Sequence, residues 1–201
     1  MYEIKSERWK RIEEWAKKLL MMSDPERIEL IRKLLDLCDD LREKAILVFF
    51  YIYGLRPAEL LELKKSNFSI KANDLWVWLP TKKKGRERII VLSIKDTPFL
   101  DIIVRYLDTI PIVEWRLFKE WHHRSNFNRV LEKLEQRYFE KYGEEICLAP
   151  YVFRKFRESY IWSLGATTQE LLGWKGGKSI KVVEEAYALL KPVTRFKKMI
   201  K

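Results

Sequence analysis

Apolar residues recur every three or four positions through the first part of the chain, which is the spacing of one face of an α-helix. This pattern predicts an amphipathic helix over residues 1–22 and a second helix that begins after Ser23 and ends near residue 40. Ser23 and Glu26 have the spacing of a capping box, and Pro25 suits the first turn of a helix. The positions expected to point inward are Ile12, Trp15, Leu19, Met22, Ile28, Ile31, Leu34 and Leu35.

A third helix is expected over residues 41–53, which are almost wholly apolar from Ala45 onward and therefore buried on most sides. Asp40 can cap its start, and Gly54 is the type of residue that follows the end of a helix. A short helix over 57–63 begins at Pro57. Arg56 is thus confined between a buried helix and a proline, so its guanidinium has little freedom and requires an anionic partner.

The pattern changes to strands after residue 63. Segments 68–70, 75–79 and 89–92 are rich in aromatic and β-branched residues, and turn-forming residues separate them at 71–74 and 84–87. They predict a small three-stranded antiparallel sheet. The remaining helices are expected over 96–108, 113–120, 125–141, 150–164, 167–173 and 179–190. The predicted fold class is therefore α+β and mostly α-helical, with an N-terminal helical arm (1–22), one main domain (23–190) and a basic tail (191–201).

The charge balance narrows the choice of partner. The 201 residues include 40 Lys and Arg against 29 Asp and Glu, a formal net charge of +11, which favours nucleic acid first and an anionic membrane second. No apolar run approaches the roughly 18 residues of a membrane span, and no signal peptide opens the chain. Two cysteines do not suggest a disulfide framework, so the sequence is typical of an intracellular protein.

Two basic features could contact an anion. Arg56 has Glu59 one helical turn further on, and a surface ion pair between the two is the simplest alternative to a functional role. Segment 81–88 has five bases and one acid at a hairpin tip, where it could follow a phosphate backbone or be an ordinary solvated charge run.

Two later segments could complete a site. Tyr151 and Arg154 are three residues apart on a predicted helix and face the same way, although an ordinary amphipathic helix would look similar. Leu172, Gly173 and Trp174 precede a Gly-Gly loop, and Tyr187 follows it. His122 and His123 have no partners at metal-ligand spacing, so we interpret them as solvated helix residues and expect no metal site.

In this order, the four segments resemble the catalytic domain of the tyrosine recombinases, the phage integrase family. Residues 54–60 match the family's Gly-Leu-Arg-x-x-Glu-Leu box, and 81–88 match its β-hairpin with a lysine. Tyr151 to Arg154 correspond to His-x-x-Arg, and residues 172–174 correspond to Leu-Gly-His or Leu-Gly-Trp. Tyr187 stands at the position of the nucleophile. The resemblance covers residues 25–190 and implies a helical catalytic domain with a small sheet.

The resemblance implies a role for each matched residue in site-specific DNA recombination, by cleavage and rejoining through a 3′-phosphotyrosyl intermediate. Tyr187 would attack the phosphodiester, while Arg56, Arg154 and Trp174 would hold its oxygens. Lys83, with Lys82 as the runner-up, would protonate the leaving 5′ oxygen. Tyr151 would be a further catalytic residue, with Glu59 and Lys155 in support. The expected DNA contacts are Lys82, Lys84, Arg86, Arg88 and Arg157. No metal and no cofactor is implied.

The sequence departs from the family pattern at several positions. Tyr151 replaces a histidine, and a phenol can donate or orient but is a weak base. Lys155 replaces a second frequent histidine, and the interval from Trp174 to Tyr187 is a few residues long. These departures leave two alternatives, a catalytically silent DNA-binding protein that keeps the fold and a type IB topoisomerase-like enzyme. A membrane-surface protein is less favoured because the bases are not gathered on one amphipathic helix.

The resemblance also implies partners and a cellular setting. Double-stranded DNA is the expected partner, and several protomers would assemble on it as a tetrameric synapse. The protein would lie in the cytoplasm with the DNA, and its divergence is expected of integrases from archaeal viruses or plasmids. The family's separate helical core-binding domain has no counterpart in these residues, so the sequence is expected to be part of a longer protein or a naturally short one.

Overall fold

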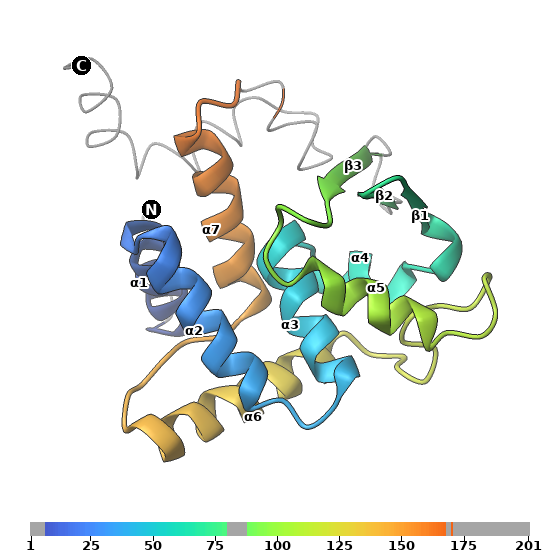
Figure 1. Cartoon of the computed structure of the whole chain (residues 1–201). Helices are drawn as coiled ribbons and strands as arrows, with labels where there is room; N and C mark the ends of the chain where they lie inside the picture. Colours follow the sequence, from blue (N-terminus) through green and yellow to red (C-terminus); the bar gives the residue numbers. More distant parts are fainter. Residues whose placement is uncertain (1–6, 80–87, 168–169, 171–201) are drawn as a thin grey trace, which may run out of the picture.

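The computed structural model describes residues 7–79, 88–167 and 170. Helices dominate, and a small sheet follows the fourth of them along the chain (Figure 1). The helices are α1 (Glu7–Met21), α2 (Asp24–Asp36), α3 (Leu41–Tyr53), α4 (Pro57–Glu62), α5 (Leu100–Asp108), α6 (Ser125–Tyr142) and α7 (Pro150–Ser163). A 3-10 turn, η1 (Lys65–Asn67), leads into β1 (Phe68–Lys71), β2 (Asp74–Leu79) and β3 (Arg88–Ser93). The predicted fold class is confirmed.

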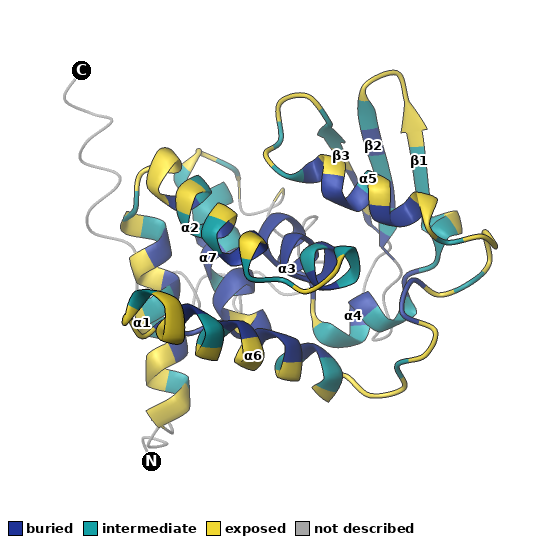
Figure 2. Ribbon diagram, turned by 60° about the horizontal axis from the view of Figure 1, so that its bottom comes forward, coloured by how far each residue is buried: buried dark blue, intermediate teal, exposed yellow. Residues whose placement is uncertain are grey.

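Helix α3 is the centre of the core. Every residue from Ala45 to Tyr53 is buried, and α5, α6 and α7 all pack against this helix. Figure 2 shows α3 in dark blue between the sheet on one side and α1 and α2 on the other. The Asp40 side chain accepts a hydrogen bond from the Glu43 backbone N at 2.8 Å, and Gly54 ends the helix in the left-handed region at φ 57°. Both caps agree with the sequence prediction.

The sheet is antiparallel, with strand order β1-β2-β3. Alternate residues of β2, Leu75, Val77 and Leu79, are buried against the helices. Trp76 and Trp78 lie on the opposite face, where their rings stack with centroids 6.4 Å apart. The period of two read from the sequence therefore matches the two faces of the sheet.

Helix α1 packs along α7 and shares the main core. Ile12, Ala16 and Leu19 are buried in the same cluster as α3. Arg8 is paired with Glu132 of α6 at 3.1 Å. The predicted arm thus lies on the rest of the molecule over its described residues, and the domain boundaries stay a prediction. None of the helices in the described ranges is long and apolar enough to span a membrane.

The helix predicted over 113–120 is wrong. This segment forms turns and an isolated antiparallel bridge between Lys64 and Arg116. Its backbone is bound to the chain after α4: Leu117 N donates to Leu63 O at 2.8 Å, and Ser66 N donates to Val113 O at 2.9 Å. These long-range hydrogen bonds satisfy backbone groups that a helix would have paired locally.

Candidate active site

The junction between α3 and α4 lies directly against α7. A Cβ added to Gly54 would be 3.3 Å from the Arg154 Cα and 3.2 Å from the Arg157 Cβ. The Gly54 carbonyl accepts a hydrogen bond from Arg154 Nη1 at 3.0 Å. Position 54 thus requires glycine for two reasons: its φ is positive, and α7 approaches its backbone closely. This contact joins two segments that are about a hundred positions apart.

Arg56 and Glu59 form the first part of a charged cluster. Glu59 Oε2 accepts the Arg56 backbone N–H at 2.7 Å, and Glu59 Oε1 accepts from Arg56 Nη1 at 3.1 Å. The Glu59 side chain is buried, whereas the Arg56 side chain is 48% exposed. The guanidinium is therefore anchored on one edge and open to solvent elsewhere, as a group that binds an external anion must be.

Two further arginines, both buried, approach the same carboxylate. Arg88 Nη2 lies 3.1 Å from Glu59 Oε2, and Arg154 Nη1 lies 3.6 Å from it. Arg154 Nε is also 3.1 Å from Glu158 Oε1, one turn further along α7. The three guanidiniums outnumber the carboxylates of Glu59 and Glu158, so the cluster has one positive charge in excess. We call these five residues the Glu59 cluster.

Several donors of the Glu59 cluster are buried and have no hydrogen-bond partner within the described part of the chain. They are Nε and Nη1 of Arg88 and Nη2 of Arg154. A buried donor left unpaired costs about 1–3 kcal/mol, so each of these groups needs an explanation, and a bound anion would provide one. Burial lowers the pKa of Arg88, while the neighbouring Glu59 carboxylate opposes the shift. The arrangement can stabilise an additional negative charge.

Arg88 is a cluster member that the sequence analysis did not recognise. Its charge suggests one more DNA-contacting base of the hairpin, whereas the structure buries it, with 6% exposed, at the start of β3. The alternation of the strand contains the missing signal: Arg88 has the same parity as buried Ile90, and Ile89 and Val91 are exposed. A side chain in register with the core face points inward.

Tyr151 and Lys155 lie against α1. The Tyr151 ring is 5.6 Å from that of Trp9, with the two rings edge to face, and the residue is 46% exposed. Lys155 Nζ binds Glu13 Oε1 at 2.9 Å and lies 5.1 Å from the Trp9 ring centroid. The structure thus brings Arg56, Glu59, Arg88 and Arg154 together and directs Tyr151 and Lys155 toward α1.

The other predicted site residues are less fully placed. Arg157 packs beside Gly54, with its guanidinium carbon 5.4 Å from the Tyr160 ring centroid, and burial lowers its pKa. The remaining predicted residues, Lys82, Lys83, Lys84, Arg86, Trp174 and Tyr187, lie outside the described residues. Among the residues described, no group of three or more His, Cys, Asp or Glu side chains could hold a metal ion.

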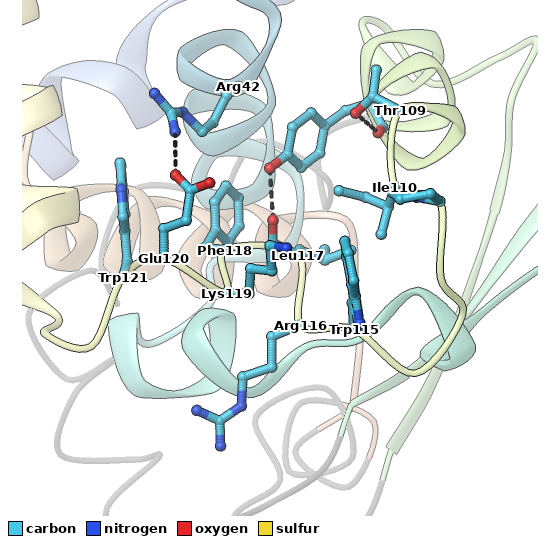
Figure 3. A pocket seen from close by; sticks show the side chains of 12 residues that line it. Arg42, Thr109, Ile110, Trp115, Arg116, Leu117, Phe118, Lys119, Glu120 and Trp121 are labelled. Atoms are coloured by element: carbon cyan, nitrogen blue, oxygen red, sulfur yellow. Dashed lines mark hydrogen bonds and ion pairs between the residues drawn. The ribbon is translucent and has the colours of Figure 1, made fainter.

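A pocket of about 170 Å³ lies away from the Glu59 cluster, between the start of α3, the end of α5 and residues 110–121 (Figure 3). Its charged groups have partners: Arg42 is 3.6 Å from Glu120, and Arg116 is 3.0 Å from Glu62. Lys119 Nζ lies 3.4 Å from the Trp115 ring centroid. None of the predicted site residues lines this pocket.

Comparison with known proteins gives three kinds of match. A model of the phage integrase family matches residues 24–187. The tyrosine recombinase XerA of Pyrococcus horikoshii is 30% identical over 148 residues, which cover 71% of this chain and 50% of that protein. The chain thus spans about half the length of this curated relative.

Solved structures have a similar fold. A crystal structure of XerA recombinase matches with a TM-score of 0.62 and 17% identity over 99% of this chain and 64% of that one. The Tn1549 transposon integrase in complex with transposon right end DNA matches with a TM-score of 0.66 and 14% identity over 89% of this chain and 64% of that one. The XerH recombinase bound to difH substrate matches with a TM-score of 0.61 and 12% identity over 89% of this chain and 51% of that one.

Proposed function

Because the chain belongs to the phage integrase family, we propose that it is the catalytic part of a site-specific DNA recombinase that cleaves and rejoins strands. The observation that carries the proposal is the Glu59 cluster, in which Arg56 and Arg154 come from distant segments to one carboxylate. Two guanidiniums beside each other match the geometry of a phosphate group better than ammonium groups do.

The proposed role of the two arginines follows from the charge of the reaction. A phosphodiester under attack gathers negative charge on its non-bridging oxygens, and preorganised donors stabilise that charge most effectively where water is excluded. Arg154 is fixed by Gly54 O and by the nearby carboxylate of Glu158, and Arg56 is fixed by Glu59. Neither guanidinium has to reorganise far when the phosphate binds.

The bond changes are assigned to residues outside the described ranges. The Tyr187 phenol would release its proton to solvent, and its oxygen would form a bond to phosphorus as the bond to the 5′ oxygen breaks, which gives a 3′-phosphotyrosyl intermediate. Lys83, or Lys82 in its place, would donate the proton that the leaving 5′ oxygen takes up. Trp174 would donate its indole N–H to a phosphate oxygen. Attack by a free 5′ hydroxyl would then reverse these steps on a new strand, and no metal ion is required.

DNA binding would rest on charge as well as on the site. The net charge of +11 favours contacts with many backbone phosphates, so affinity for DNA is expected to fall steeply as salt rises. Lys82, Lys84, Arg86 and Arg157 are the proposed contributors. Relatives whose structures contain DNA support this partner. Assembly of four protomers on DNA, a location with the DNA in the cytoplasm and service to a viral or plasmid element belong to the same proposal.

One observation favours a second candidate, a DNA-binding protein that keeps the fold without catalysis. Tyr151 takes the place of a histidine and lies on Trp9, away from Glu59, so a strong general base is missing from that position. In the recombinase proposal Tyr151 acts only by donating or orienting a hydrogen bond, and Lys155 supports it.

A suicide substrate distinguishes the two candidates. This is a duplex nicked near the scissile phosphate, so that the short 5′ product diffuses away and the covalent adduct accumulates. The recombinase proposal expects an adduct with the wild-type chain and none with Tyr187→Phe, while both bind DNA equally. DNA binding without any adduct would favour the silent protein. Relaxation of supercoiled plasmid lacking a specific site would instead indicate topoisomerase-like activity.

A further inference from the structure

Arg88 is held in a buried place where it can pair with Glu59. It is the first residue of β3 and pairs across the ladder with Leu79, which is buried. Its Nη2 lies 3.1 Å from Glu59 Oε2, and its side chain is 4% exposed. The strand therefore determines where this guanidinium lies. Its burial argues against a role as a DNA contact at the surface.

The Glu59 carboxylate interacts with all three arginines of the cluster, two of which are proposed to bind the phosphate. Its Oε2 accepts from the Arg56 backbone and from Arg88, and it lies 3.6 Å from Arg154 Nη1. A buried carboxylate attracts any guanidinium within reach, since the interaction is weakly screened there. If Arg88 were absent, Glu59 would be satisfied at the expense of the two arginines that are proposed to hold the phosphate.

The charge count leads to the same conclusion. With Arg88 the Glu59 cluster has one positive charge in excess, and without it the three positive and two negative charges become two of each. Nε and Nη1 of Arg88 are also buried donors without a hydrogen-bond partner among the described residues. An arginine with only a structural role would be expected to have its donors paired, because each unpaired one is costly.

We propose that Arg88 is a positioning residue of the phosphate site: it occupies Glu59 and keeps the cluster positive, so that Arg56 and Arg154 remain available to the anion. The inference rests on the proposed function, which supplies the phosphate, and it gives the first residue of β3 a part in the site. The effect of replacing Arg88 on phosphate binding should depend on the charge of the cluster rather than on the stability of the fold.

The first test uses inorganic phosphate and does not depend on activity. The rise in thermal midpoint is measured as phosphate is added at constant ionic strength, because a ligand that binds the folded chain stabilises it. The cluster charge is +1 in the wild type, 0 in Arg88→Met, +1 in the Arg88→Met/Glu59→Gln double variant and +2 in Glu59→Gln. The apparent affinity for phosphate should rise with the cluster charge, by about tenfold for each unit of charge.

Arg116→Met is the matched control. Arg116 also pairs with a glutamate of α4, Glu62, at 3.0 Å, but its side chain is about half exposed. This variant should bind phosphate as the wild type does. Arg88→Lys keeps the charge and loses the planar fork, so it should lie between the wild type and Arg88→Met. If Arg88→Met does not fold, the comparison of Glu59→Gln, with a cluster charge of +2, and the double variant, with +1, still measures the effect of removing Arg88.

The second test uses the suicide substrate at saturating DNA. Arg88→Met should lower the rate of adduct formation about a hundredfold, with DNA affinity changed less than about threefold, because many other phosphate contacts remain. The double variant should be faster than Arg88→Met alone. If the wild type forms no adduct but the variants bind phosphate in the predicted series, the recombinase proposal is rejected and the role of Arg88 stands. Equal phosphate affinity in all variants, or none in the wild type, would overturn that role.

Discussion

Arg154 and Tyr151 lie one turn apart on α7, yet their surroundings differ in kind. Arg154 is buried, with its guanidinium between Gly54 O, Glu59 and Glu158. Tyr151 is half exposed and rests on the Trp9 ring, and Lys155 beside it pairs with Glu13. Spacing along the helix predicts that two side chains face one way, but the elements packed against the helix decide what each of them meets.

The difference has an energetic side. The contacts of Arg154 are buried ionic ones, where removal of one partner leaves charges unpaired and costs about 3–5 kcal/mol. Those of Tyr151 and Lys155 are aromatic and partly exposed ionic contacts, each of which contributes about 1 kcal/mol. The surroundings of Arg154 therefore have the rigidity that a phosphate site needs, whereas Tyr151 and Lys155 attach α1. Substitutions around Arg154 should lower both activity and stability, whereas those at the contact with α1 should lower stability and leave activity almost unchanged.

The largest effect is expected from Arg154→Met. Loss of this guanidinium should lower the rate of adduct formation on the suicide substrate by about 10²–10³-fold, because a preorganised donor to the phosphate oxygens is removed. Arg105→Met is the control, since Arg105 is an exposed arginine of α5 paired with Asp101 at 3.6 Å. A rate for Arg154→Met within tenfold of the control would show that Arg154 has no contact with the reacting phosphate.

Gly54→Ala should destabilise the fold by about 1–3 kcal/mol, because alanine is strained at positive φ and its Cβ would press on α7. Gly143→Ala is the matched control: Gly143 has φ +69° with nothing within 4 Å of an added Cβ, so only the backbone strain applies. Denaturant unfolding of both measures the difference. Equal losses would mean that α7 yields to the methyl group, and adduct formation should then be unchanged.

Trp9→Ala should cost about 1–2 kcal/mol, since it removes the aromatic contact with Tyr151 and the cation–π contact with Lys155. The midpoint of thermal unfolding measures this loss, and Trp9→Phe should recover most of it. At a temperature where the variant is folded, its rate of adduct formation should stay within about threefold of the wild type. A folded Trp9→Ala variant without activity would place α1 in the active site.

The smallest effect is expected from Tyr151→Phe. The ring contact with Trp9 survives, and only the hydroxyl is lost, so the rate of adduct formation should fall about threefold or less. The dependence of that rate on pH should keep its shape. A fall of a hundredfold would show instead that the phenol acts directly on the DNA, as the histidine of the family pattern would.

Local rules accounted for the parts of this fold that depend on neighbouring residues. The capping box of Ser23 and Glu26, the Asp40 cap and the Gly54 cap all occur where the sequence predicts them. So does the sheet, because a period of two is visible in a single strand. The helix prediction for segment 113–120 was wrong. The backbone of this segment forms hydrogen bonds with residues 63–66, and no pattern within the segment reveals so distant a partner.

The sequence by itself determined the order of the elements up to β3, the burial of α3 and the position of Arg56 between a buried helix and a proline, because helix caps and apolar periodicity act over a few residues. Only the tertiary structure decided which charges share Glu59. The inward turn of Arg88, the approach of Arg154 to Gly54 and the contact of Tyr151 with Trp9 each depend on packing between distant segments. A charge acts through its neighbours in space, and these are known only once the chain has folded.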